Sequence, residues 1–308
     1  MATDYVLFIH GVKNRNEAEF QKTAQGLLNS IRQSMKDNTR DLKPVFFFWG
    51  DLNVQPQLTL QRGLEASPAW KGMWFQSLRT TQILEFVGDA ALYLSRHVGS
   101  QVVRRFQETA LGSLQGAAPG DRLHLITHSM GTVIFFDILF ASRWEDPRLD
   151  EDASTRQIRQ IVSQIRDALF GLGAHPGAGL PVASIHTMGS PIALFSLLSV
   201  TGESSHDLSP NLKEFLRRLF NLRQNKELLW HNFIHPGDPI AYPLSGVIPL
   251  LLPDSQRYVR VRDMLTQRGN LWNTPFQQTL VPLLGGGDAH GSYWKSELVA
   301  KTIAEVLR

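Results

Sequence analysis

The strongest constraint on the fold is a regular alternation between short apolar runs and longer segments with helical spacing. The apolar runs have the length of single strands and lie at residues 5–9, 44–50, 122–127, 182–191, 228–239 and 257–265. Helical patterns lie between or after them, at residues 19–35, 86–114, 130–141, 153–170, 213–222 and 292–307. Buried strands that alternate with helices form parallel sheets covered on both faces. We therefore predict an α/β fold with a doubly wound, mostly parallel sheet of about six strands.

The length and apolar content of the chain are sufficient for one large domain. With 308 residues and 43% apolar composition, the chain can bury a substantial core. We expect a single domain over residues 1–308, in which 51–84 and 143–180 are insertions or cap segments.

Local signals predict where two helices begin and where structure is irregular. Asn14 and Glu17 form a capping-box pattern before the first helix, and Asp89 is a candidate cap for the helix near residues 86–114. Residues 53–82 are rich in Gln, Trp and Thr, and we expect them to be irregular.

Composition excludes several classes of function. The 31 Lys and Arg residues barely exceed the 28 Asp and Glu residues, which argues against a nucleic-acid partner. The absence of cysteine excludes disulfides, thiolate metal sites and cysteine nucleophiles. The first residues lack the basic region of a signal peptide, and no apolar run reaches the ~18 residues of a membrane span. We therefore expect a cytoplasmic protein with no transmembrane segment, and its oligomeric state is left open.

A serine separates two apolar runs in RLHLITHSMGTVIFFDIL, residues 122–139. One interpretation is a helix cap, because serine is favoured at helix N-termini. The other is a nucleophile on a strand–turn–helix elbow, which needs small residues two positions before and after the serine. Thr127 and Gly131 occupy these positions around Ser129. This stretch alone is compatible with both interpretations.

The order of the other candidate residues favours the nucleophile. A serine hydroxyl near neutral pH needs a base and an acid that orients the base. In elbow-type hydrolases these partners follow in the order Ser, Asp or Glu, His. Asp238 comes just after the fifth predicted strand, and among ten histidines only His290 lies beyond it. We predict a catalytic triad of Ser129, Asp238 and His290. Weaker candidates for the acid are Asp254, Asp263 and Asp288.

The predicted triad assigns a role to each residue. Ser129 would attack an acyl carbonyl, and His290 would accept the serine proton and return it to the leaving group, oriented by the aspartate. The oxyanion formed by this attack needs backbone donors. We expect them from the N–H of Met130, at the start of the following helix, and from Gly11 or Val12 after the first strand.

Four further side chains are predicted to border the substrate pocket: His10, His128, Trp74 and Leu250. We expect His10 to support the oxyanion loop rather than ionise, and His128 to pack beside the nucleophile. Leu250 belongs to the apolar stretch 243–253, and Trp74 to a segment rich in Trp and Met. Each of these two segments is either core packing or a wall that binds an acyl chain.

Metal and nucleotide sites are not predicted. His124 with His128, and His231 with His235, have i, i+4 spacing, but they lie on strands or strand ends and lack the Glu of the H-E-x-x-H motif. The glycine clusters contain no G-K-[ST] sequence. We therefore predict no metal and no organic cofactor.

The motifs HG after the first strand, THSMG, GDP and AHGSYW resemble those of the α/β-hydrolase superfamily, in particular its lipase-like serine hydrolases. The resemblance spans roughly residues 4–307, and Thr127 departs from the usual glycine. It implies the triad machinery but not the substrate.

We predict a serine hydrolase that cleaves carboxylic esters through an acyl-enzyme, with a small-molecule or lipid-like ester as its substrate. Two alternatives remain open. One is an acyltransferase or thioesterase with the same triad. The other is a non-catalytic scaffold of this fold that binds a ligand or a partner.

Overall fold

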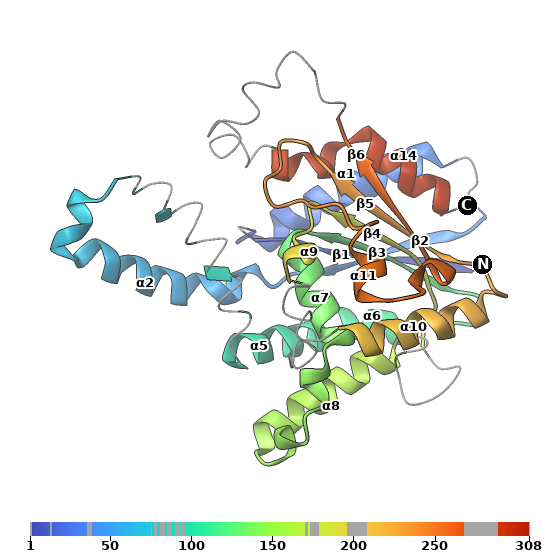
Figure 1. The fold of residues 1–308 in the computed structure, drawn as a ribbon, viewed down its shortest axis with the longest axis horizontal. Helices are drawn as coiled ribbons and strands as arrows, with labels where there is room; N and C mark the ends of the chain where they lie inside the picture. The colour runs from blue at the N-terminus through green and yellow to red at the C-terminus, as the bar shows by residue number, and fades with distance from the viewer. Residues whose placement is uncertain are drawn as a thin grey trace.

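The computed structural model describes residues 2–12, 14–35, 39–74, 76, 79–80, 84, 88–89, 93, 96–169, 172, 179–195, 208–267 and 289–307. Within these residues, parallel strands form one six-stranded sheet in the order β2-β1-β3-β4-β5-β6. The strands are β1 (Thr3–Ile9), β2 (Asp41–Phe47), β3 (Arg122–His128), β4 (Val182–Met188), β5 (Leu228–Ile234) and β6 (Val259–Leu265). Helices cover both faces of the sheet (Figure 1). The predicted α/β fold with a parallel sheet is confirmed.

The direction in which the sheet is built reverses at β1. β2 pairs with one edge of β1, and the next strand in the chain, β3, pairs with its other edge. At such a reversal the loops after the two neighbouring strands leave a crevice in which ligands bind. Gly11 follows β1 and Ser129 follows β3, so the topology brings these two predicted site residues to the same edge of the sheet.

The helices form two layers. α1 (Glu17–Ser34) and α14 (Glu297–Val306) lie together on one face, where their apolar side chains pack with those of the strands. On the other face, a larger core includes side chains from α5 (Arg96–Phe106), α7 (Met130–Phe140), α8 (Ala153–Asp167) and α10 (Ser209–Leu222). Four more α-helices lie within the described residues: α2 (Val54–Ala66), α6 (Gly112–Gln115), α9 (Ile192–Phe195) and α11 (Ile248–Leu251). None of the helices described is both long and apolar enough to cross a membrane.

The central helix α7 is buried over its whole length, although it contains a carboxylate. Asp137 Oδ2 accepts hydrogen bonds from the Tyr93 hydroxyl at 2.6 Å, from Arg143 at 2.6 Å and from the Trp144 indole at 3.1 Å. A buried charge is tolerated only when such partners replace water. This network therefore explains how a charged residue can stand inside a buried helix.

Two predicted helix caps are wrong. α1 is capped by Asn16, whose Oδ1 accepts a hydrogen bond from the Glu19 N–H at 3.2 Å. Asn14 instead donates its side-chain amide to carbonyls of the loop after β1. Asp89 has helical backbone, and its buried carboxylate accepts hydrogen bonds from other side chains rather than from a helix N-terminus.

The segment 53–82 is more regular than predicted, because it contains α2. Gln57 is the buried side chain of α2, so this helix lacks the apolar stripe by which a sequence reveals a helix. In Figure 1, α2 extends away from the sheet. The assignment of residues 51–84 and 143–180 as cap segments stays a prediction.

A row of polar side chains crosses the sheet on the face covered by α1 and α14. Ser184 Oγ is hydrogen-bonded to His124 Nδ1 and to His186 Nε2, both at 2.7 Å. The ring of His231 lies 5.4 Å from that of His186. Burial lowers the pKa of all three histidines, so they are neutral in the folded protein near pH 7.

Histidines that are buried and neutral in the folded protein predict a loss of stability in mild acid. Burial lowers the pKa of His10 and of His128 to about 3, and that of His186 well below 6.5. Below about pH 6.5 the unfolded chain therefore binds protons that the folded protein does not. The free energy of unfolding should fall by about 1.4 kcal/mol per pH unit for each such histidine. Urea unfolding between about pH 7 and pH 5 measures this slope, and equal stability across that range would contradict it.

The contact between α7 and β1 predicts the effect of a single methyl group. A Cβ at Gly131 would lie 2.3 Å from the carbonyl oxygen of His10 and 2.9 Å from Ile9 Cγ2. Gly131→Ala should therefore lower the free energy of unfolding by about 1–3 kcal/mol or more. Gly26→Ala is the matched control, because Gly26 lies on the exposed side of α1, where a Cβ meets nothing within 4 Å, and it should stabilise by about 0.5–1 kcal/mol. Urea unfolding compares the two variants, and unchanged stability of Gly131→Ala would contradict the contact.

Candidate active site

Ser129 lies on a strained turn between β3 and α7. Its backbone has φ 54° and ψ −133°, a conformation that residues with a Cβ rarely adopt. Such strain persists where the surroundings impose it, as at functional sites. Here the Ser129 N–H donates to the Met188 carbonyl at 2.9 Å. The side chain makes no capping hydrogen bond to α7, so the helix-cap interpretation is wrong.

Small residues allow this turn to form. A Cβ at Gly11 would lie 2.3 Å from Ser129 Cβ, so the loop after β1 could not approach the serine with a larger residue there. Thr127 lies two positions before Ser129, and its hydroxyl is hydrogen-bonded to that of Thr132 at 2.8 Å. The two threonines thus connect the end of β3 to the first turn of α7.

Asp238 and His290 form a hydrogen-bonded pair. His290 Nδ1 lies 2.8 Å from Asp238 Oδ2, and the carboxylate has no exposed surface. Burial alone would raise the pKa of Asp238, but hydrogen bonds from His290 and Tyr293 outweigh this effect and lower it. The aspartate is therefore ionised at neutral pH, and it holds a proton on Nδ1 of the imidazole.

Two residues beside this pair were not predicted. A Cβ at Gly189, which has φ +55°, would lie 2.8 Å from Asp238 Oδ2 and 3.1 Å from His290 Nδ1. The Tyr293 hydroxyl donates to Asp238 Oδ2 at 2.7 Å. The available sequence signals were the glycine at the end of a predicted strand and the tyrosine three positions after the histidine.

His128, the residue before Ser129, contacts the predicted base. Its Nε2 donates to the His290 carbonyl at 2.7 Å, and the two rings are 4.6 Å apart. A Cβ at Gly11 would be 3.0 Å from His128 Nδ1 and 2.9 Å from Ser129 Oγ, so these two atoms flank the same glycine. His128 therefore contacts His290 directly and, like Ser129, borders Gly11.

Ser129 Oγ and His290 Nε2 are both buried, and neither has a hydrogen-bond partner among the residues described. Because Nδ1 carries the proton shared with Asp238, Nε2 presents a lone pair. Catalytic hydrogen bonds are often long or unformed before substrate binds. His290 Nε2 can therefore accept the proton of the Ser129 hydroxyl when the two atoms come within hydrogen-bonding distance.

The three predicted oxyanion residues lie beside Ser129 in two segments. Met130 is the first residue of α7, where backbone N–H groups have no partner within the helix. Gly11 and Val12 belong to the loop after β1, which His10 supports. His10 lies 2.5 Å from the Gly11 carbonyl through Nδ1 and accepts the Trp49 N–H at 3.0 Å through Nε2.

A partly buried ion pair ties the same loop to the chain after β2 and to α2. Arg15 donates to the Gly50 carbonyl at 2.7 Å and to Asp89 Oδ1 at 3.0 Å. Asn53 and Gln57 donate to the same carboxylate oxygen, at 2.8 and 2.6 Å. The predicted oxyanion loop is therefore held on two sides, by Trp49 and by this network.

The alternative acids have other surroundings. Asp263 accepts hydrogen bonds from Asn232 at 2.7 Å and from the Leu244 N–H at 2.9 Å, which makes it part of the packing between β5 and the chain after Asp238. Asp254 is exposed and starts a short turn before β6. Asp288 lies outside the described residues.

The predicted pocket residues fall into two groups. His10 and His128 are buried around Ser129, whereas Trp74 and Leu250 are 80% and 82% exposed. Among the residues described, no hydrogen bond or ring contact joins Trp74 or Leu250 to the three predicted triad residues. The stretch 243–253 serves partly as core, since three of its leucine and isoleucine side chains are buried: Leu244, Ile248 and Leu252.

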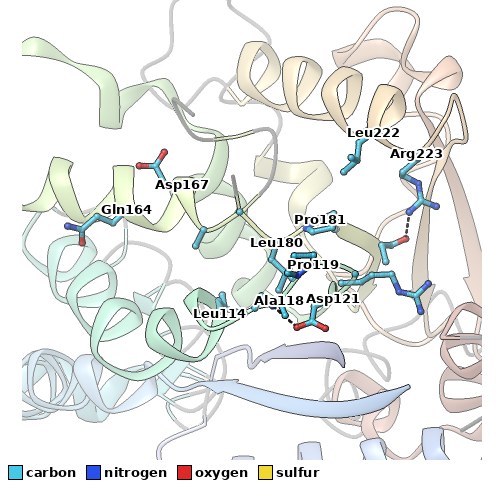
Figure 2. A pocket seen from close by; sticks show the side chains of 17 residues that line it. Leu114, Ala118, Pro119, Asp121, Gln164, Asp167, Leu180, Pro181, Leu222 and Arg223 are labelled. Carbon is cyan, nitrogen blue, oxygen red and sulfur yellow. Dashed lines mark hydrogen bonds between the residues drawn. The ribbon is translucent and has the colours of Figure 1, made fainter. Parts of the chain in front are cut away.

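A cavity of about 850 Å³ lies at the opposite end of the sheet. It borders the first residues of β3 and β4, and Figure 2 shows Asp121, Leu180 and Arg223 around it. Ligands of parallel sheets bind at the carboxyl ends of the strands, so this cavity lies at the end where a substrate site is not expected. Within the described part of the chain, no group of three or more His, Cys, Asp or Glu side chains could hold a metal ion.

Part of the chain is similar to mammalian phospholipases. It is 26% identical over 161 residues to phospholipase DDHD1 of Homo sapiens, covering 42% of this chain and 16% of that protein. For phospholipase DDHD1 of Mus musculus the identity is 28% over 162 residues, covering 42% and 26%. The chain thus aligns with less than a third of the length of these relatives. No protein-family model matches it.

Proposed function

We propose that this chain is a serine hydrolase that cleaves carboxylic esters through a Ser129–His290–Asp238 triad. The observation that carries the proposal is the strained, buried Ser129, whose hydroxyl does not cap the helix that follows it. The ionised Asp238 beside His290 supports it, because this pair leaves a basic nitrogen on the imidazole.

The reaction follows from these positions. Ser129 Oγ attacks the ester carbonyl while His290 Nε2 takes the hydroxyl proton, and the carbonyl oxygen becomes an oxyanion. Backbone N–H groups of Met130 and of Gly11 or Val12 stabilise that charge. The C–O bond then breaks, and His290 returns the proton to the departing alcohol. Water, deprotonated by His290, attacks the acyl-enzyme and releases the acid and the serine.

Lipid-like acyl esters are the substrate class that we propose. The partial similarity to proteins named phospholipase supports this class. The same triad could serve an acyltransferase or thioesterase, and added alcohol or thiol acceptors would reveal transfer as an ester or thioester product.

Replacement of the serine tests the proposal directly. Wild-type protein should be labelled by a fluorophosphonate probe, which bonds to the serine oxygen with loss of fluoride, and Ser129→Ala should not be labelled. Ser255→Ala is the matched control, because Ser255 is also buried with an unpartnered hydroxyl but precedes β6 at the other end of the sheet. Labelling that persists in Ser129→Ala would overturn the assignment, and an unlabelled wild type would favour a non-catalytic scaffold.

A chain-length series tests the proposed substrate class. If Leu250 contacts the acyl chain, Leu250→Ser should lower kcat/KM for long-chain relative to short-chain p-nitrophenyl esters by about three- to ten-fold. Leu298→Ser, on α14, is the control, because that side chain is also exposed but lies on the helix layer of the other face. A ratio that does not change in Leu250→Ser would remove this residue from the pocket.

A further inference from the structure

Tyr293 connects the acid and the base of the proposed triad. The side chain is fully buried, and its hydroxyl donates to Asp238 Oδ2 at 2.7 Å. The same hydroxyl accepts the backbone N–H of His235 at 2.8 Å. His235 and Asp238 are the first and last residues of one turn, closed by a 2.9 Å hydrogen bond from the Asp238 N–H. One hydroxyl therefore holds both ends of the turn that carries the acid.

Tyr293 and His290 donate to the same carboxylate oxygen. His290 Nδ1 lies 2.8 Å from Asp238 Oδ2, and both donors belong to the short helical segment that precedes α14. The other oxygen, Oδ1, accepts the Ile240 N–H at 3.2 Å. Burial and the nearby carboxylate raise the pKa of Tyr293, so its hydroxyl keeps its proton and acts as a donor.

We infer that Tyr293 is a positioning residue, which orients the Asp238 carboxylate toward His290 and limits how strongly that carboxylate stabilises the imidazolium. This inference rests on the proposed function, because it assigns Tyr293 a role within the same triad.

The inference predicts the direction of a pH effect. A hydrogen bond from Tyr293 withdraws negative charge from Oδ2. Without it, more charge remains on the carboxylate, and the protonated form of His290 is stabilised. Because the proposed base must be neutral to accept the serine proton, the acid limb of the rate profile should then move to higher pH.

Among the described residues, two other histidines are close to this group, His128 through its ring and His235 through its backbone N–H. His128 lies 4.6 Å from the His290 ring, and burial lowers its pKa to about 3, so it stays neutral over the range of the assay. His235 accepts the Gly237 N–H through Nδ1 at 3.0 Å. Neither histidine side chain is hydrogen-bonded to the Tyr293 hydroxyl. A change at Tyr293 therefore acts first on Asp238.

Tyr293→Phe tests the inference, with Tyr93→Phe as a matched control. Tyr93 is equally buried and donates to a buried carboxylate, Asp137, at 2.6 Å on the opposite face of the sheet. Both variants should lose thermal stability. Only Tyr293→Phe should lower kcat for a short-chain ester, by about ten- to a hundred-fold with little change in KM, and shift the acid limb of kcat/KM upward by about half a pH unit.

Failure of this inference can be separated from failure of the proposed function. If Ser129→Ala abolishes turnover but Tyr293→Phe shows the wild-type acid limb, Tyr293 is a packing residue and the inference is overturned. The His290 Nδ1 proton offers a readout that needs no turnover. Its downfield ¹H resonance should move in Tyr293→Phe and stay in place in Tyr93→Phe, and an unmoved resonance would also overturn the inference.

Discussion

The site depends on a close approach between the turn after β3 and the loop after β1. At Gly11 a Cβ would stand 2.3 Å from that of Ser129, and at Gly131 it would stand 2.3 Å from the His10 carbonyl oxygen. The strained serine backbone costs of the order of 1–3 kcal/mol. Burial of the whole of α7 offsets this cost, since each large apolar side chain contributes roughly 1.5–3 kcal/mol. The elbow is thus stabilised by the helix that it begins.

Three buried carboxylates differ from Asp238 in their partners. Asp4, Asp89 and Asp137 are each paired with at least one arginine, at 2.6 to 3.0 Å. Among the described residues, Asp238 has no such cation, and its partners are an imidazole, a phenol and a backbone N–H. The first three are neutralised permanently and hold structure together. The negative charge of Asp238 instead faces His290, a side chain that can gain a proton.

Much of the fold and part of the site could be predicted from the sequence. The parallel sheet was predictable because each strand is a short apolar run, buried on both faces and followed by a helix. Asp238 and His290 were predictable because chain order left one histidine, and the structure places them in contact, although their catalytic role remains a proposal. The order of the strands did not follow from the sequence, since it depends on which edge of β1 each later strand joins.

Other features lacked a local signal. α2 buries Gln57 rather than a row of apolar side chains, so its helical character is not encoded in a hydrophobic period. The roles of Asp89 and Tyr293 depend on partners 32 to 74 and 55 to 58 positions away, respectively. Asp89 resembled a helix cap because local spacing alone cannot distinguish a cap from a buried acceptor. The role of Gly189 could not be predicted from the sequence, because its small size matters only to side chains from two other segments of the chain.

The scatter of these groups along the chain has a consequence for biosynthesis. The loop after β1 is translated early, the serine near the middle, and the imidazole close to the C-terminal helix. On the proposed mechanism, a nascent polypeptide on the ribosome carries an inert alcohol until the segment with His290 has emerged and docked. Reactivity is then withheld from any chain on which this segment has not yet folded.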